Sequence, residues 1–297
     1  MQKDKSNKLP DASQQEPDEL IALAQAHNLT QMGLRPPLLT YVKQTWQKRD
    51  FMSSMAVFRM RGQMEENRLG FLWFIIRPIL DSLIYGAIFG VLQGNSRPPD
   101  YVAYVVTGVF LFNFFTASFA DGGQSIIGSR ILVQTLAFPR ATLPLSRVLQ
   151  DLYSMLPSIA LLPFILMLRG HYPSFQWLLL IPLIVLLTLF CSGAAMLAAR
   201  VTVHLRDLSQ LIPVISRLLF YTSGVLFDVN KIFTGHPLVV TLYNFHPLYQ
   251  VLRIARGVMM GTDYPLHYWI DFSAWSVAIF VFGLIYFWAA EERYGSE

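Results

Sequence analysis

The residues of this chain that could do acid–base, metal or nucleophilic chemistry are few and scattered. There are six His and one Cys, and no His pairs with carboxylates at metal-ligand spacing. The chain lacks the G-x-x-x-x-G-K-S/T motif that cradles nucleotide phosphates, and it lacks H-E-x-x-H and G-x-S-x-G. The sequence therefore predicts a protein that is not an enzyme, with no catalytic, metal or cofactor-binding residue.

Three aspartates near the ends of apolar segments are the remaining candidates for ion coupling: Asp81, Asp151 and Asp271. An ionisable residue inside a membrane is costly and often functional. However, Asp81 follows Arg77 by one helical turn, so the two can pair locally. Asp151 can reach the membrane interface. We interpret these carboxylates as structural rather than as a coupling-ion site.

Six apolar stretches, each long enough to cross a bilayer, must position whatever function the chain has. A hydrocarbon core of ~30 Å needs about 20 helical residues. Charged residues make up only 14% of the chain, which leaves too few to cover a large soluble core. The runs also lack the alternation of barrel strands. We predict an all-α integral membrane fold with six transmembrane helices. They are Phe71–Leu92, Tyr101–Ala120, Val148–Leu168, Phe175–Ala199, Leu208–Phe227 and Trp269–Ala290.

The distribution of positive charge orients these helices. With the N-terminus inside, most of the 23 Lys and Arg residues lie on the inner side of the membrane. The positive-inside rule therefore predicts that both termini are cytoplasmic. The net charge of +4 is modest and gives no indication of a nucleic-acid partner. Five cations fall outside: Arg97, Arg169, Lys231, Arg253 and Arg256.

The N-terminal region divides into two parts before the membrane domain begins. Residues 1–35 are polar, and we predict a mobile cytoplasmic tail. In residues 36–60, Leu39, Val42 and Trp46 recur at helical spacing among Lys and Gln. This pattern favours an amphipathic helix in the cytoplasmic membrane interface, since a span follows directly. An amphipathic helix packed on a soluble partner is the alternative. The six-helix domain is then 61–297.

The segment between the last two spans, Asp228–Tyr268, is apolar but broken by Pro237, Pro247 and Gly257. It is too apolar for water and too interrupted to span. We favour a pair of re-entrant helices that dip into the outer leaflet. A small external cap is the alternative.

Two features point to helix packing and to a partner. Ser82, Gly86, Gly90 and Gly94 recur every four residues on the first span and form a small-residue ridge. The ridge would serve either a second copy or packing within the subunit. The connection Asp121–Arg147 contains a short amphipathic helix around Arg130–Ala137 that ends at Phe138-Pro139-Arg140, and its apolar residues are Ile131, Leu132 and Leu136. Such a helix between two spans is a natural contact for a soluble partner, although an ordinary cytoplasmic loop has the same appearance.

Four groups of residues follow one another along the chain. They are Arg68-Leu69-Gly70-Phe71-Leu72-Trp73 with Pro78; Phe138-Pro139-Arg140 with Leu143-Pro144-Leu145; Arg206-Asp207-Leu208 with Ser223–Phe227; and His246-Pro247-Leu248 with Arg253, Arg256 and Gly261. In this order the groups resemble the membrane subunits of ABC exporters of the ABC-2 type, especially exporters of lipid-linked polysaccharide. The resemblance covers about residues 50 to 290, and His246 stands where the family usually has Asn.

This resemblance implies a homodimeric permease in the cytoplasmic (inner) membrane of a bacterium. Two copies of a separate ABC ATPase would bind ATP and Mg²⁺, and the dimer would export O antigen, capsule, teichoic acid or a cell-wall glycan. Small-molecule export by the same type of permease, or a non-transporting membrane scaffold, are the alternatives. The residues expected to contact the ATPase are Arg130, Leu132, Leu136, Phe138, Pro139 and Arg140.

A cytoplasmic loop carrying Arg206 and Asp207 also belongs to the predicted site. Sugars stack on aromatic faces, so aromatic residues of the spans are candidates to line a channel for the glycan. Packing within the helix bundle, or against lipid, is the alternative for each of them. The aromatic candidates are Tyr85, Phe89, Phe112, Phe115 and Tyr221.

Overall fold

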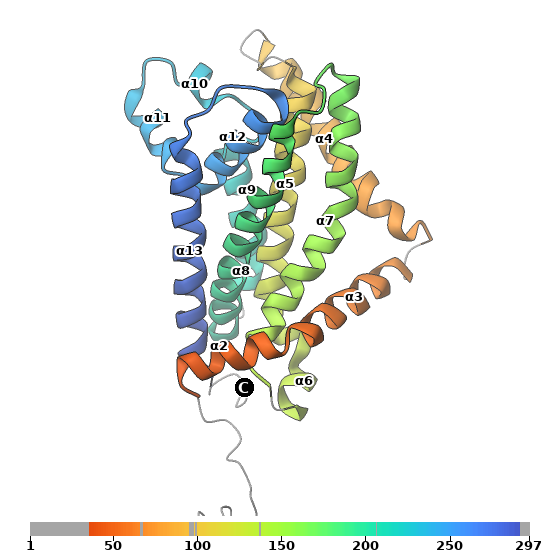
Figure 1. Cartoon of the computed structure of the whole chain (residues 1–297), viewed down its shortest axis with the longest axis vertical. Coiled ribbons are helices and arrows are strands. Elements are labelled where there is room, and N and C mark those ends of the chain that lie inside the picture. Colours follow the sequence, from red (N-terminus) through yellow and green to blue (C-terminus); the bar gives the residue numbers. More distant parts are fainter. Residues whose placement is uncertain are drawn as a thin grey trace, which may run out of the picture.

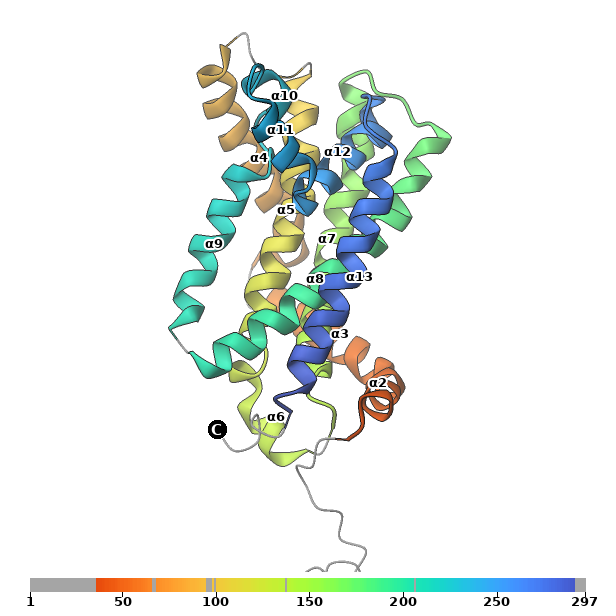
Figure 2. The ribbon, with the colours of Figure 1, turned by 90° about the vertical axis from the view of Figure 1, so that its left-hand side faces the viewer.

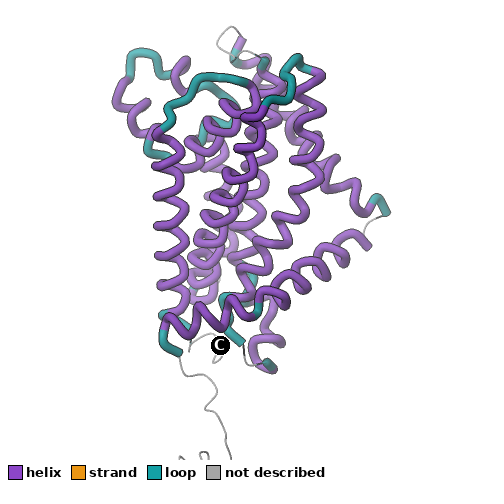
Figure 3. The backbone as a smooth tube through the Cα atoms, viewed as in Figure 1, coloured by secondary structure: helices purple, strands orange, loops and turns teal. Residues whose placement is uncertain are grey.

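The computed structural model describes residues 36–65, 68–94, 98, 100–136, 138–205 and 207–291. Within these ranges every regular element is a helix, and no strand occurs (Figure 3). The predicted all-α fold is therefore found over the described chain. The predicted tail, residues 1–35, lies outside the described residues.

Five helices are long and apolar enough to cross a membrane, and they run along the long axis of the molecule (Figure 1). They match five of the six predicted spans. Short 3-10 turns precede two of them: η1, Gly70–Leu72, and η4, Phe175–Leu179. The five are α4 Trp73–Leu92, α5 Tyr101–Gly123, α7 Thr142–Leu168, α8 Leu180–His204 and α13 His267–Trp288.

Helix α5 forms the centre of the bundle, with α4, α7 and α8 packed around it. Its adjacent residues Phe110 and Leu111 point in different directions, yet each is only 1% exposed. A helix that is apolar on all sides is buried on all sides. On the other flank, α8 and α13 approach closely because Gly193 and Gly283 face each other's backbones. A Cβ atom on Gly193 would lie 2.4 Å from the Ile279 carbonyl oxygen.

The remaining predicted span, Leu208–Phe227, is represented by α9, Leu208–Thr222, which has 15 residues. At 1.5 Å per residue it is about 22 Å long, less than the ~30 Å hydrocarbon core. The chain turns after α9, where Gly224 adopts φ +68°. Crossing by this segment therefore stays a prediction. Figure 2 shows α9 beside α5, with its outer side uncovered by other helices.

The predicted interfacial helix over residues 36–60 is two helices, α2 Leu38–Gln47 and α3 Arg49–Glu65. They lie across one end of the bundle, where α2 is nearly perpendicular to the long helices and α3 runs obliquely (Figure 1). The break falls at Lys48, whose N–H is shared among three preceding carbonyls. Helix α2 buries Tyr41 and Thr45 and leaves Leu39 84% and Trp46 67% exposed. Such a face suits a membrane interface.

The opposite end of the bundle carries α10 Val229–Ile232, α11 Pro237–Asn244 and α12 Pro247–Met260. Helix α12 packs among α5, α8 and α13, whereas no residue of α11 is buried. Helix α12 begins at Pro247, and the ring of His246 just before it accepts a hydrogen bond from the Tyr249 amide. It ends at Gly261, which adopts the left-handed conformation. Helices thus stand where a re-entrant pair was predicted, but their depth in a membrane stays a prediction.

Candidate functional site

The predicted docking helix is α6, Arg130–Thr135, which projects from the same end of the bundle as α2 (Figures 1 and 2). The turn η3, Ile127–Ser129, leads into it. It ends because Leu136 is extended and Pro139 follows shortly. It is two residues shorter than the predicted Arg130–Ala137, and residue 137 lies outside the described residues.

The apolar side chains of α6 divide between the protein and the outside. Ile131 is 79% exposed and Leu136 51% exposed, whereas Val133 is buried at 6%. Leu132 is half-buried, and Arg130 is exposed. Val133 therefore fastens the helix to the bundle, while Ile131 and Leu136 form an exposed apolar edge. The sequence pattern placed Leu132 on that edge together with them, and it did not identify Val133 as the anchor.

The entrance to α6 is hydrogen-bonded to α3. The Arg59 guanidinium donates to Ser129 Oγ at 2.9 Å and to Ser146 Oγ, at the start of α7, at 3.3 Å. Burial, then the nearby Arg147, lowers the pKa of Arg59 to about 10, while Asp121 opposes the shift. Arg59 stays protonated at neutral pH and joins α3, α6 and α7 at one point.

The exit from α6 is fastened to both α2 and the end of α13. The Tyr41 hydroxyl donates to the Glu291 carboxylate at 2.8 Å and accepts from the Ala141 amide at 2.9 Å. The other Glu291 oxygen accepts from the Arg140 amide at 2.9 Å, and the Arg140 guanidinium bonds the Glu291 carbonyl. Burial raises the pKa of Glu291, although the bonds from Arg140 and Tyr41 favour its charged form.

Aromatic contacts reinforce the same attachment. Phe138 packs against Phe51 of α3 with ring centroids 5.7 Å apart. Trp288, at the end of α13, donates from its indole N–H to the Pro36 carbonyl at 2.8 Å. The Pro139 carbonyl accepts from Thr142 and begins α7. The predicted residues Phe138, Pro139 and Arg140 therefore lie together at the exit of α6.

Three residues of this site were not identified from the sequence: Tyr41, Arg59 and Glu291. Glu291 alone carried a visible signal, since it is a carboxylate that directly follows an apolar span. Tyr41 and Arg59 lie in amphipathic segments where polar residues are expected, and their partners are distant in the chain. Of the predicted loop pair, Arg206 lies outside the described residues, and Asp207 is exposed just before α9.

The small-residue ridge of α4 does not form one uniform face. Ser82 is buried and donates to the Pro78 carbonyl of its own helix. A Cβ atom on Gly90 would lie 3.3 Å from the Tyr101 ring of α5, whereas Gly86 and Gly94 have open space beside them. Gly90 thus serves packing within the chain, and contact of the ridge with a second copy stays a prediction.

The predicted channel aromatics form one cluster where α4, α5 and α9 meet. Tyr85 lies 4.8 Å from Phe220, and Phe112 lies 5.2 Å from Phe220, between ring centroids. Phe112 and Phe115 are 3% and 4% exposed and belong to the core of this single chain. Tyr221 is 43% exposed and Phe89, 6.3 Å away, is half-buried. The outer members therefore lie at the surface of the single chain and the inner pair lies in its core. Contact of these aromatic residues with a ligand stays a prediction.

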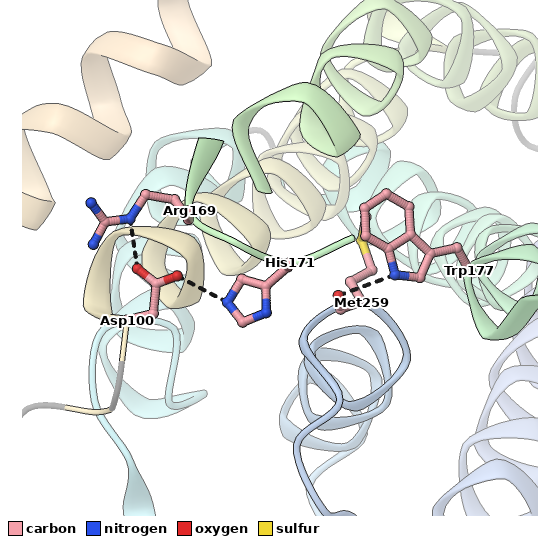
Figure 4. Close-up of polar contacts among 5 residues, drawn as sticks. All are labelled: Asp100, Arg169, His171, Trp177 and Met259. Atoms are coloured by element: carbon pink, nitrogen blue, oxygen red, sulfur yellow. Dashed lines mark hydrogen bonds and ion pairs between the residues drawn. The ribbon is translucent and has the colours of Figure 1, made fainter. Parts of the chain in front are cut away.

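At the opposite end of the bundle, the loop after α7 holds two helices in place (Figure 4). Asp100, just before α5, accepts from Arg169 at 2.8 Å and bonds the His171 ring at 2.9 Å. The Trp177 indole donates to the Met259 carbonyl, at the end of α12, at 3.1 Å. The loop therefore ties the start of α5 to the end of α12.

A fully buried arginine, Arg256, lies at the same end of the bundle. Arg256 of α12 is 1% exposed and donates to three carbonyls, those of Tyr104, Gly224 and Val225. Its guanidinium also lies 3.4 Å from the centroid of the Tyr104 ring. Because the Gly224 and Val225 carbonyls directly follow α9, Arg256 fixes the end of that helix to α5 and α12.

No group of three or more His, Cys, Asp or Glu side chains that could hold a metal occurs in the part of the chain that the structure describes. Cys191 is a buried free thiol within α8. The site consists of the exposed edge of α6 and of two attachments whose hydrogen bonds lie within the chain. That this edge contacts a partner stays a prediction.

Comparison with known proteins agrees with the sequence resemblance. The family model described as ABC-2 type transporter matches residues 54–260. Two O-antigen export system permease proteins RfbA of Klebsiella pneumoniae are each 26% identical over 203 residues, covering 68% of this chain and 77% of the relative. An RfbA protein of the same description from Myxococcus xanthus is 26% identical over 196 residues, covering 66% of this chain and 75% of the relative.

Proposed function

The chain belongs to the ABC-2 type transporter family, and we propose that within it the protein exports a lipid-linked polysaccharide across the cytoplasmic membrane of a bacterium. Its relatives named O-antigen export permeases support this substrate class. The chain is the transmembrane subunit, and ATP and Mg²⁺ bind a separate ATPase. O antigen, capsule, teichoic acid and cell-wall glycan all fit this class.

The observation that carries the proposal is the exposed apolar edge of α6 together with its buried attachments. None of the described residues covers Ile131 and Leu136, which lie at the end of the bundle that the positive-inside rule assigns to the cytoplasm. An amphipathic helix of this kind fits an apolar groove on a partner. We assign that groove to the ATPase, two copies of which serve a dimer of this chain.

The attachments explain how a movement of α6 reaches the membrane. At the start of α6, the bonds of Arg59 to Ser129 and Ser146 connect a movement of α6 to α3 and α7. At its end, the bonds of Glu291 to Tyr41 and Arg140 connect the movement to α2 and α13. Closure of the ATPase around ATP would displace α6, and these bonds oblige the surrounding helices to follow. The helices that then separate or tilt are α4 and α9 of the two copies, whose outer sides are uncovered in the single chain.

The test is depletion of the chain in its native cell. We expect a lipid-linked glycan to accumulate inside the cell and the matching polymer to disappear from its surface, as measured by mass spectrometry and by labelling of intact cells. Accumulation of a small molecule or lipid with no glycan would indicate the small-molecule exporter instead. A scaffold would be indicated if nothing accumulates and if an α6 variant that no longer binds the ATPase still restores the growth of the depleted cells.

A further inference from the structure

A group of polar side chains lies about halfway along the helix bundle, on the side where α4 and α9 are uncovered. Asp81 of α4 accepts a hydrogen bond of 3.1 Å from the Asn113 side chain, and Asn113 is near the midpoint of α5. Arg217 lies about 14 Å along α9 from its start. Ring contacts join the same stretches of α4 and α9, because Tyr85 lies 4.8 Å from Phe220 and Phe89 lies 6.3 Å from Tyr221 between ring centroids. Arg217 precedes Tyr221 by one helical turn, so it lies next to the stretch of α9 that contacts Tyr85.

The group is open to the outside of the single chain. Arg217 is exposed, Tyr221 is 43% exposed, and Asp81, Tyr85 and Asn113 are half-buried. Helix α9 buries Ile212, Ser216 and Phe220 and turns Arg217 away from them. The structure gives Arg217 no hydrogen bond and no ion pair within 4.0 Å among the described residues, and Asp81 is bonded to Asn113 rather than to its helix neighbour Arg77.

Two full charges at this depth are not compatible with a lipid-facing surface. A guanidinium and a carboxylate in hydrocarbon are costly unless they pair or reach water. If the predicted span begins at the membrane surface next to Leu208, Arg217 lies too far along α9 for its side chain to reach that surface. The uncovered face of α4 and α9 must therefore border a polar space, which a second copy of this chain would enclose.

The chemistry of the group suits the hydroxyls of sugars. Asp81 offers acceptor oxygens, Arg217 offers several donors in one plane, and the Asn113 amide offers both. The rings of Tyr85 and Tyr221 provide flat apolar faces beside them. The two charges are of opposite sign, so a neutral polyol gains hydrogen bonds from both without being held by a net charge. Weak binding of this kind is what passage through a pore requires.

We propose that Asp81, Asn113 and Arg217 form a subsite that binds sugar hydroxyls of the glycan as it passes between two copies of this chain. The proposal rests on the proposed function and adds to it the side chains that contact the polymer. It also explains why Asp81 lies against α5. The Asn113 amide donates to the carboxylate and fixes its position beside α5.

Photo-crosslinking in intact cells tests this placement. A photoreactive amino acid replaces Leu218, which is 62% exposed on α9 next to Arg217, and a matched chain carries it at Ile270, which is 73% exposed on α13. We expect a glycan adduct from position 218 that antibody to the polymer detects, and only lipid from position 270. Lipid alone, or only a second copy of the chain, at position 218 would overturn the proposal.

Substitutions test the chemistry. Asp81→Asn and Arg217→Gln should each reduce the position 218 adduct and the surface polymer at least fivefold, with chain level and ATPase co-purification unchanged. The control Asp271→Asn removes a half-exposed carboxylate from α13 and should leave both readouts intact. Loss with Arg217→Gln but not with Asp81→Asn would show that Arg217 binds an anion such as phosphate, and the hydroxyl subsite would be wrong.

The outcome separates this proposal from the proposed function. If the unaltered chain exports glycan but both variants behave as it does, the subsite is wrong and the exporter assignment stands. If depletion of the unaltered chain leaves the surface polymer in place, the exporter assignment itself fails, whatever the variants do.

Discussion

Tyr41 donates a hydrogen bond of 2.8 Å to Glu291, and this bond joins two residues 250 positions apart in the chain. The same hydroxyl accepts from the Ala141 amide at the exit of α6. One phenol thus connects the N-terminal amphipathic helix, the end of the last long helix and the segment that follows α6. Because α2 touches the bundle over a short distance, this bond is central to how α2 stays attached.

The first prediction concerns Tyr41→Phe, which keeps the ring and removes only the hydroxyl. The Ala141 amide and the Glu291 carboxylate each lose a partner, at a cost of about 1–3 kcal/mol for a buried group. We expect a lower melting temperature in detergent and faster proteolysis between α2 and α3. Tyr172→Phe is the control, since Tyr172 is 78% exposed. Equal behaviour of the two variants would mean that the hydroxyl bonds contribute nothing to the attachment.

The second prediction is a pH dependence at Glu291. Burial raises its pKa above the usual 4.5, so the attached state binds a proton more tightly than the detached state. Attachment therefore strengthens as the pH falls through the raised pKa and gains nothing further below about 4.5. The melting temperature of the unaltered chain, relative to Glu291→Gln, should rise over that interval. A relative decrease on acidification would show that the Arg140 contact outweighs burial.

The third prediction separates docking from coupling through Arg59. In Arg59→Ala, Ser129 loses its bond to α3, but the exposed edge of α6 is untouched. We expect the ATPase to co-purify as before while surface polymer falls severalfold. Arg61→Ala, an exposed arginine on the same helix, is the matched control. Loss of co-purification with Arg59→Ala would place Arg59 in the docking surface, and unchanged export would remove it from the coupling path.

These residues show what the sequence could and could not predict. Five long helices and the position of α6 follow from apolar run length and from Pro139, which are local signals. Tyr41, Arg59 and Glu291 are joined by contacts between distant segments, and no local pattern records which polar residue of an amphipathic helix turns inward. The break at Lys48, which divides the predicted helix in two, has no proline or glycine to announce it.

Within the membrane domain, too, the contacts of a residue could not be predicted from its spacing in the sequence. The i,i+4 spacing of Arg77 and Asp81 suggested a local pair, but Asp81 bonds Asn113 on a neighbouring helix instead. Ser82, Gly86, Gly90 and Gly94 share a spacing, yet the packing of α5 beside α4 covers them unequally. Sequence spacing places residues on one helix, and only the positions of the other helices decide what each of them meets.

The fourth prediction concerns the room that Gly108 leaves for Arg256. A Cβ atom at position 108 would lie 2.5 Å from the Arg256 guanidinium, whose place is fixed by three carbonyls. Gly108→Ala should therefore displace Arg256 and lower the melting temperature. Each carbonyl left without a partner costs about 1–3 kcal/mol. Gly62→Ala, with open space beside it in α3, should be neutral or stabilising.

Arg256→Lys supplies the complementary measurement, because an ammonium group cannot match the planar contacts of a guanidinium with three carbonyls and a ring. It should lower the melting temperature as Gly108→Ala does, and the two effects should not add, since both release the same contacts. Full additivity would show that the two residues act independently.

The fifth prediction tests α6 as the docking element, which separates a transporter from a scaffold. Ile131 and Leu136 are largely exposed in the part of the chain that the structure describes, so Ile131→Asp and Leu136→Asp should leave the protein inserted and folded. Loss of a buried anchor from an interface often costs about 2 kcal/mol or more, roughly thirtyfold in affinity. We expect both co-purification with the ATPase and surface polymer to be lost. Gln134→Asp adds the same charge to an exposed polar position of α6 and should have little effect. If ATPase binding and export survive both apolar substitutions, α6 is not the docking helix, and the bonds of Arg59 and Glu291 serve the architecture of this end alone.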